Sequence, residues 1–149
     1  MRSGVRIALD IGARRIGVAR CDRDGILAVP EATLDAADAG WIDAVAALVA
    51  EYDPIELVVG RPVTLRGTDE LAVQAVLIQV AALHERLQTL PIRLVDERLT
   101  TAASMRALRE AGRSTRTARA VIDAAAAVAI LEFALETERR TGAPAGSLV

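Results

Sequence analysis

Three acidic residues that lie far apart in the sequence occur beside or within apolar runs, where an ionised carboxylate is costly to bury. Asp10 closes residues 5–10, Glu97 follows the run at residues 92–95, and Asp123 lies inside residues 120–128. Burying one unpartnered carboxylate costs several kcal/mol, and three that converge repel one another unless a divalent cation neutralises them. This set therefore predicts a metal site suited to the hydrolysis of phosphodiester bonds.

Each acid taken alone also has a structural explanation. Asp10 suits a turn, Glu97 suits an exposed position, and Asp123 suits a buried, hydrogen-bonded cap. The occurrence of all three in such surroundings favours one shared site over three separate structural roles.

Basic residues are concentrated shortly before the third acid. The fourteen residues from 106 to 119 contain a single acid, Glu110, and five arginines: Arg106, Arg109, Arg113, Arg116 and Arg119. Positive charge of this density predicts a surface that contacts phosphates, although a solvated helix face would show the same pattern. All 18 basic residues of the chain are arginine, so the identity of these residues carries little functional information.

Length and composition limit the class of protein. The 149 residues are expected to form one domain, residues 1–140, followed by a flexible C-terminal tail, residues 141–149. The apolar share of 52% and the charged share of 26% are typical of globular proteins. A single cysteine, Cys21, excludes an internal disulfide bond, and no cluster of His and Cys has the spacing of zinc ligands.

The sequence also bears on location and partners. It lacks the apolar segment of a signal peptide, and its longest apolar stretch, residues 124–131, is far shorter than the ~20 residues that cross a bilayer. We therefore expect a cytoplasmic protein with no membrane partner. The net charge of −2 argues weakly against a nucleic-acid-binding protein, and the aromatic share of 2% favours recognition through phosphates and shape over base stacking.

Five strands are expected. Residues 5–10, 15–21 and 26–29 predict an antiparallel meander, with a hairpin turn at residues 22–25 and an end to the third strand at Pro30. Residues 55–60 and 92–95 are continuous apolar runs, which are typical of strands covered on both faces.

Four helices are expected to accompany these strands. Apolar spacing predicts helices over residues 40–52, from Thr68 to a break at Pro91, from Thr100 or Thr101 to Gly112, and over residues 117–138. The expected fold is an α/β domain with a mixed five-stranded sheet, made of the antiparallel meander plus two parallel strands, and with helices packed on both faces.

This topology would bring the acids together. Sites in α/β sheets lie at the carboxyl ends of the parallel strands, where Asp10 ends the first strand and Glu97 follows the fifth. Asp123 would reach the same edge from the last helix. Gly12 permits a tight turn after Asp10, so backbone amides there are expected to face a phosphate.

Four segments together resemble the YqgF family, whose members are assigned to Holliday junction resolution or to pre-16S rRNA processing. The segments are residues 8–19 (ALDIGARRIGVA), residues 58–62 (VVGRP) with Gly67-Thr68, residues 96–101 (DERLTT), and residues 123–128 (DAAAAV). Their order and spacing cover residues 5–135, and the DERLTT block is specific to the family.

The resemblance implies a ribonuclease H-like fold in which Asp10, Glu97 and Asp123 are catalytic acids that hold the metal. It also implies that four motif residues contact or orient phosphate, namely Gly12, Arg15, Arg98 and Thr100. Arg61 departs from the family, which usually carries an apolar residue there, and residues 62–67 lack the usual Asn. Arginine also replaces the commoner lysine before Asp123, so these departures concern loop contacts more than the acids.

The leading hypothesis is a nuclease that uses Mg²⁺ or Mn²⁺ to hydrolyse phosphodiester bonds in structured nucleic acid. Its preferred substrate is the 5′ end of the 16S rRNA precursor, and the alternative is a Holliday junction in DNA recombination or repair. A junction resolvase should be a homodimer that makes paired cuts, whereas a processor of RNA ends could be a monomer.

Two hypotheses from other classes stay open. A non-catalytic module that binds nucleic acid or the ribosome would keep the fold and the arginines without needing a metal. An actin-like, nucleotide-binding fragment would share the Asp-x-Gly hairpin, but it needs a second domain copy that 149 residues cannot supply. Such a fragment also gives no reason for Glu97 and Asp123 to occur together.

Overall fold

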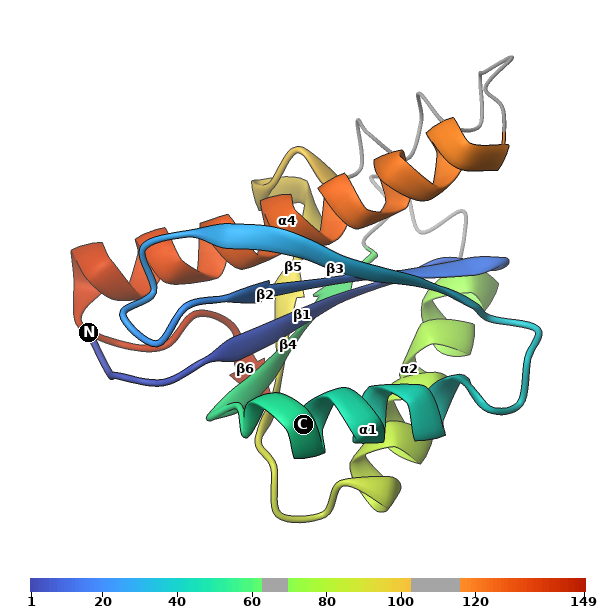
Figure 1. The fold of residues 1–149 in the computed structure, drawn as a ribbon, viewed down its shortest axis with the longest axis horizontal. Coiled ribbons are helices and arrows are strands. Elements are labelled where there is room, and N and C mark those ends of the chain that lie inside the picture. Colours follow the sequence, from blue (N-terminus) through green and yellow to red (C-terminus); the bar gives the residue numbers. More distant parts are fainter. Residues whose placement is uncertain (63–69, 103–115) are drawn as a thin grey trace.

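The computed structural model describes residues 1–62, 70–102 and 116–149, with only the backbone for residues 116–123 (Figure 1). The elements in chain order are β1 (Arg6–Ile11), β2 (Arg15–Cys21), β3 (Ala28–Asp35), α1 (Trp41–Tyr52), β4 (Glu56–Arg61), α2 (Glu70–Arg86), β5 (Ile92–Asp96), the short 3-10 helix η1 (Glu97–Leu99), α4 (Arg116–Thr141) and β6 (Ser147–Leu148). The helix expected from Thr100 to Gly112 falls mostly outside the described residues. None of the described helices is long and apolar enough to cross a membrane.

The strands form one mixed sheet in the order β3-β2-β1-β4-β5-β6. β1 pairs antiparallel with β2 and parallel with β4, and β4 pairs parallel with β5. The predicted meander and the predicted parallel strands are therefore confirmed, and the two strands that carry or precede Asp10 and Glu97 run in the same direction.

The sheet has six strands instead of the predicted five. Ser147 and Leu148 in the tail pair antiparallel with Leu94 and Arg93 of β5. Gly146, at a φ of +73°, brings the chain so close to the Leu94 carbonyl that a side chain there would collide with it. A strand of two residues has no apolar alternation, so the sequence pattern contains no signal for it.

The predicted end of the third strand at Pro30 is wrong. β3 continues through Pro30 to Asp35, and Pro30 pairs with Ala19 where the register with β2 shifts, between Val18 and Ala19. β3 is the edge strand of the sheet, where a residue without an N–H group is tolerated at an irregular position.

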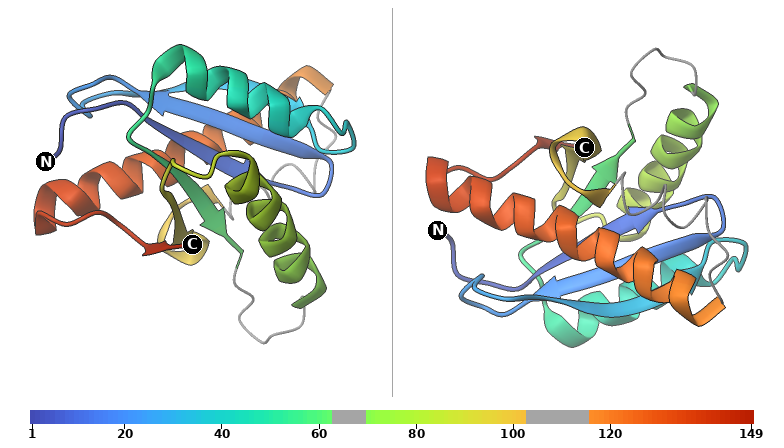
Figure 2. Two further views of the ribbon diagram at one scale, coloured as in Figure 1. Left: turned by 90° about the horizontal axis from the view of Figure 1, so that it is seen from below. Right: turned by 90° about the horizontal axis from the view of Figure 1, so that it is seen from above.

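Helices cover both faces of the sheet, as predicted (Figure 2). One face is built from small residues of β1 and its neighbours, such as Ala8, Ala19 and Val58, and packs against α4. The opposite face is built from larger residues, such as Leu9 and Val59, and packs against α1 and α2. Because successive strand residues point to opposite faces, this division decides which side chains of β1 lie beneath α4.

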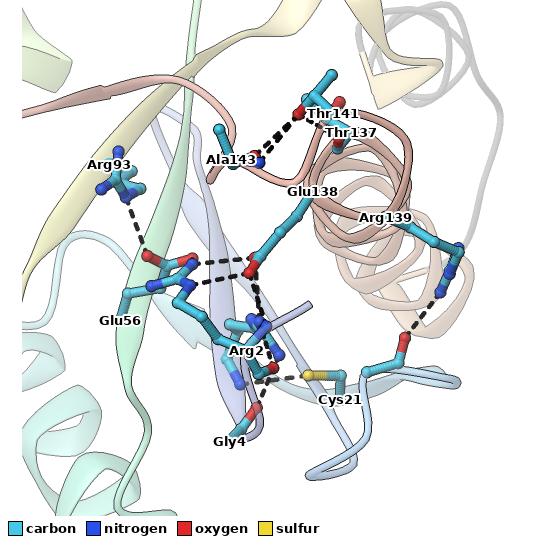
Figure 3. A network of polar contacts seen from close by, with 12 residues as sticks. Arg2, Gly4, Cys21, Glu56, Arg93, Thr137, Glu138, Arg139, Thr141 and Ala143 are labelled. Atoms are coloured by element: carbon cyan, nitrogen blue, oxygen red, sulfur yellow. Dashed lines mark hydrogen bonds and ion pairs between the residues drawn. The ribbon is translucent and has the colours of Figure 1, made fainter.

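A buried ion-pair network anchors one end of α4 at the beginning of β1 (Figure 3). Glu138 of α4 accepts hydrogen bonds from Arg2 at 2.9 Å and from Arg6 at 3.0 Å, and Glu56 accepts bonds from Arg2 at 2.9 Å and Arg93 at 3.0 Å. These bonds, the one from Arg2 foremost, lower the pKa of Glu138 to about 2. The earlier residues of α4 therefore run from this anchor toward the other end of β1.

Candidate active site

Asp10 is buried near the carboxyl end of β1 with 2% of its surface exposed. It alternates with Ala8, so it lies on the sheet face that α4 covers. Its neighbour on β2 is Gly17, and Gly60 on β4 comes directly after the paired positions Leu9 and Val59. Both strands beside Asp10 thus offer a residue without a side chain, which leaves room around the carboxylate.

Gly60 also sets how closely α4 approaches the sheet. A Cβ atom at Gly60 would lie 2.6 Å from Cδ1 of Ile130, a residue of α4 with no exposed surface. Any other residue at position 60 would force the Ile130 side chain or α4 to shift, because such a short distance between carbon atoms does not occur in folded proteins. α4 is therefore held against the sheet immediately beside Asp10.

The backbone of α4 carries residue 123 toward the same end of β1. Residue 123 precedes Ile130 by seven positions, about two helical turns, and lies farther from the anchored Glu138. At i, i+4 and i+7, residues 123, 127 and 130 follow one line along the helix, and Ala127 and Ile130 on that line are fully buried. This placement keeps Asp123 a candidate for the third acid.

Glu97 begins η1 directly after β5 and has 3% of its surface exposed. Burial foremost, together with the charge of Asp96, raises the pKa of Glu97 to about 7. Only β4 separates β5 from β1, so their backbones are about 10 Å apart, twice the usual strand spacing. Asp10 and Glu97 are therefore two buried carboxylates at one edge of the sheet, as the sequence predicted.

The turn that buries Glu97 is held by its neighbours in the DERLTT block. The Asp96 carboxylate accepts hydrogen bonds from the Arg98 backbone amide at 2.9 Å and from the Arg98 guanidinium at 2.8 Å. The Thr100 hydroxyl donates to the Glu97 carbonyl at 2.9 Å and accepts from the Ala102 amide at 3.0 Å. The Thr100 hydroxyl is therefore engaged by backbone groups on both sides, the Glu97 carbonyl and the Ala102 amide.

The hairpin after Asp10 holds two of the predicted phosphate contacts. The Gly12 amide donates to the Arg15 carbonyl at 2.9 Å, so this amide closes the turn. Arg15 begins β2, is half-buried, and lines a hollow of about 550 Å³ together with Arg14, Thr33 and Asp35. Among the predicted phosphate-binding residues, Arg15 and Arg98 therefore remain the side chains placed near the acids.

Several predicted residues fall outside the described side chains. Arg106, Arg109 and Arg113 belong to the segment that is not described, while Arg116 and Arg119 lie on α4 where the backbone alone is given. Among the side chains that are described, no three acids, histidines or cysteines form a group that could hold a metal. The side chain of Asp123 is not among them.

Gly17 and Gly60 are the residues near this site that sequence reasoning missed. Both occur inside apolar strands, where glycine weakens the strand and marks a close approach of another group. That signal was present in the sequence, but the approaching group, Ile130 for Gly60, becomes evident only in the folded protein.

A family model described as "RuvX: Holliday junction resolvase" matches residues 4–137 of the chain. A protein of Cutibacterium acnes named "Putative pre-16S rRNA nuclease" is 52% identical over 136 residues, which cover 91% of this chain and 84% of the relative. A protein of Thermobifida fusca with the same name is 49% identical, and the match covers 100% of this chain and 98% of the relative.

Solved structures of low sequence identity share the fold. The structure of Thermus thermophilus RuvC in complex with a Holliday junction substrate superimposes with a TM-score of 0.59 at 15% identity, covering 98% of this chain and 99% of RuvC. A second structure of Thermus thermophilus RuvC gives a TM-score of 0.56 at 14% identity and covers 96% of this chain. These likenesses confirm the predicted ribonuclease H-like architecture.

Proposed function

Because the chain belongs to the RuvX family, described by its Holliday junction resolvase activity, we propose that it is a nuclease that hydrolyses phosphodiester bonds in structured nucleic acid. Family membership confirms the resemblance to YqgF that the four sequence segments indicated. The names of the relatives in Cutibacterium acnes and Thermobifida fusca support a nuclease-type hydrolase.

The observation that carries this proposal is the pair of buried carboxylates at one sheet edge. Asp10 has 2% and Glu97 has 3% of its surface exposed, and parallel strands deliver both to the same edge. Two structural acids would not need to lie at the carboxyl ends of two parallel strands of one sheet, whereas a site that handles a phosphate and its counter-cation does.

The donor set fits a hard divalent cation. Carboxylate oxygens from Asp10, Glu97 and Asp123 are the ligands that Mg²⁺ and Mn²⁺ prefer. The raised pKa of Glu97 also fits, because a nearby cation favours the ionised form of a carboxyl whose burial disfavours it. When bound, the metal would stabilise the charge that develops on the scissile phosphate and activate a water molecule.

The remaining residues of the site act on the acids or on the substrate. Thr100 and Asp96 hold the turn that points Glu97 inward, through the hydrogen bonds to the Glu97 carbonyl and the Arg98 amide. Gly60 holds α4, and with it Asp123, against the edge of the sheet. Arg15 and Arg98 supply positive charge for the phosphates that flank the cleavage site.

The leading substrate is the 5′ end of the 16S rRNA precursor, in line with the names of the relatives. The family description favours a second candidate, the Holliday junction. A resolvase must make two matched cuts, so the two candidates differ in the oligomeric state they require. Both substrates should therefore be offered to one preparation whose solution mass is measured in parallel.

The test compares the wild-type chain with Asp10→Asn and with Asp24→Asn, the same change at an exposed hairpin position. We expect Asp10→Asn to abolish Mg²⁺-dependent cleavage while binding of the nucleic acid and the unfolding temperature stay close to wild type. Asp24→Asn should cleave normally. Wild-type cleavage by Asp10→Asn would refute the mechanism, and salt-sensitive binding without cleavage in any metal would favour the non-catalytic module.

A further inference from the structure

A hollow of about 540 Å³ lies beside the candidate active site and shares Asp96 and Arg98 with it. Its lining residues come from the ends of β4 and β5, from η1, from the second half of α4 and from the segment that leads into β6. Figure 2 shows the ribbons of these elements. Its volume falls within the ~300–1,000 Å³ range of small-molecule sites in proteins, and is therefore large enough for one nucleotide.

The lining of this hollow combines three kinds of group. Val95 and Ala145 contribute buried apolar surface, and Phe133, the only phenylalanine of the chain, contributes a half-buried ring. Arg61 and Arg98 contribute two positive charges, and Asp96, which pairs with Arg98, contributes one negative charge, so the charge of the lining is net positive. An apolar wall with one aromatic ring and two guanidiniums matches a ligand with a flat apolar face and an anionic group.

The hollow is next to the acids in both sequence and space. Arg98 follows Glu97 directly and is half-exposed. Phe133 comes three residues after Ile130, which is about one helical turn, and Ile130 lies against Gly60 beside Asp10. A nucleic-acid strand whose phosphate reaches the acids therefore has a neighbouring nucleotide within reach of the hollow.

Arg98 can serve a phosphate without leaving its intramolecular partner. Its Nε and Nη2 atoms donate to the Asp96 carboxylate at 3.2 Å and 2.8 Å. A guanidinium carries five N–H donors in a fixed plane, so these bonds fix the orientation of the group and leave donors for a second anion. Arg61 is exposed at the end of β4, in register with Asp96.

We propose that this hollow binds one unpaired nucleotide of the substrate close to the cleavage site, with its base against Phe133 and its phosphate at Arg61 and Arg98. The inference rests on the proposed nuclease function and narrows its substrate. An unpaired nucleotide is present at the single-stranded end of an RNA precursor, whereas the arms of a junction are fully paired. It also adds one stacking contact to the expected recognition through phosphates and shape, because one well-placed ring suffices for one base.

The first experiment measures binding and does not depend on cleavage. A fluorescein-labelled single-stranded RNA is titrated with the full chain in a chelating buffer, for wild type, Phe133→Leu and Phe133→Tyr. Loss of one stacked base weakens binding about tenfold, so we expect Phe133→Leu to bind about tenfold more weakly and Phe133→Tyr to bind like wild type. Tyr52→Leu, which removes an aromatic ring on α1 at the opposite face, is the matched control.

The second experiment locates the nucleotide. An abasic site is placed at each position within three nucleotides of the cleavage site, and cleavage is measured for wild type and Phe133→Leu. At one position, loss of the base should slow cleavage by wild type about tenfold. Cleavage by Phe133→Leu, which is already slower on the intact RNA, should be slowed little more by the loss of that base. Unfolding temperatures separate this effect from a folding defect, and recovery in Phe133→Tyr shows that the ring is responsible.

The outcomes separate the two proposals. The nucleotide site would be refuted, and the nuclease function would stand, if wild type and Phe133→Leu bound RNA equally well. The same would follow if the abasic site and the Phe133→Leu substitution had independent effects on cleavage at every position. Binding that depends on Phe133 without any cleavage in Mg²⁺ or Mn²⁺ would instead overturn the proposed function and keep the nucleotide site.

Discussion

Replacing Gly60 by alanine tests the close contact between α4 and the sheet. The added Cβ would lie 2.6 Å from Cδ1 and 3.3 Å from Cγ1 of the buried Ile130. Carbon atoms pack at about 3.6 Å, so the Ile130 side chain must turn away by about 1 Å or, where its full burial prevents this, α4 and β4 must move apart. Overpacking of this kind costs about 1–3 kcal/mol, which corresponds to a fall of about 3 °C in unfolding temperature per kcal/mol for a chain of this size.

The same displacement should affect catalysis more than stability. α4 carries Asp123, and a shift of about 1 Å in a catalytic group lowers the rate about 100-fold. We therefore expect Gly60→Ala to remain folded, to bind nucleic acid, and to cleave about 100-fold more slowly than wild type. Cleavage is followed under single-turnover conditions, so that binding and chemistry are measured separately.

A compensating substitution makes this reasoning refutable. Ile130→Val removes the atom 2.6 Å from the new Cβ and by itself costs about 1 kcal/mol. The double variant Gly60→Ala/Ile130→Val should recover stability and rate relative to Gly60→Ala. If the two substitutions have independent effects, or if Gly60→Ala is as stable and active as wild type, α4 is not positioned through this contact.

Three further predictions concern the charged groups and the turn beside Glu97. Burial raises the pKa of Glu97 from 4.5 to about 7, so the folded protein holds a proton that the unfolded chain has released between these values. The free energy of unfolding of wild type, relative to that of Glu97→Gln, should thus fall by about 3 kcal/mol as the pH rises from about 4.5 to about 7. Urea titrations of both proteins without metal measure this difference, and a difference that does not change with pH would contradict the prediction. Thr100→Val loses the hydroxyl bonded to the Glu97 carbonyl at 2.9 Å. This variant should weaken the dependence of cleavage on Mg²⁺ and lower the cleavage rate without changing nucleic-acid affinity, and Thr100→Ser should restore the dependence and the rate. An equal loss in the Val and Ser variants would exclude a positioning role for Thr100. Glu138→Gln removes a carboxylate whose pKa is lowered to about 2, first by its bond to Arg2, and should cost about 3 kcal/mol at pH 7 because it leaves buried arginine charge unpaired. This stabilisation is present above about pH 4.5 and is lost as the pH falls toward 2, so a Glu138→Gln defect that is as large at pH 2.5 as at pH 7 would speak against the ion pair as its cause.

The sheet and its covering helices were predictable because their signals are periodic and local. Continuous apolar runs at β1, β4 and β5 and helical spacing in α1 and α2 each report burial directly. The two misjudged features depend on neighbours instead. Pro30 is tolerated only because β3 lies at the sheet edge, and β6 forms only because Gly146 brings the tail against Leu94.

The position of two candidate acids was predictable, whereas the contacts that hold them were not. A carboxylate at the end of an apolar strand conflicts with its surroundings, and this conflict drew attention to Asp10 and Glu97, both of which are buried in the structure. The roles of Thr100 and Asp96 depend on which backbone groups their side chains meet in a turn. Sequence spacing does not specify these partners, so Thr100 was expected to contact phosphate and Asp96 was given no role.

The most direct test of the account is the anomalous diffraction of Mn²⁺ in crystals of the wild-type chain. We expect a peak at the carboxyl edge of β1 and β5, about 2.2 Å from carboxylate oxygens of Asp10, Glu97 and Asp123, and its loss in Asp10→Asn. The account would be contradicted if Mn²⁺ bound elsewhere in a preparation that cleaves its substrate, and if these three acids lay more than about 10 Å apart, beyond the reach of bridging ions.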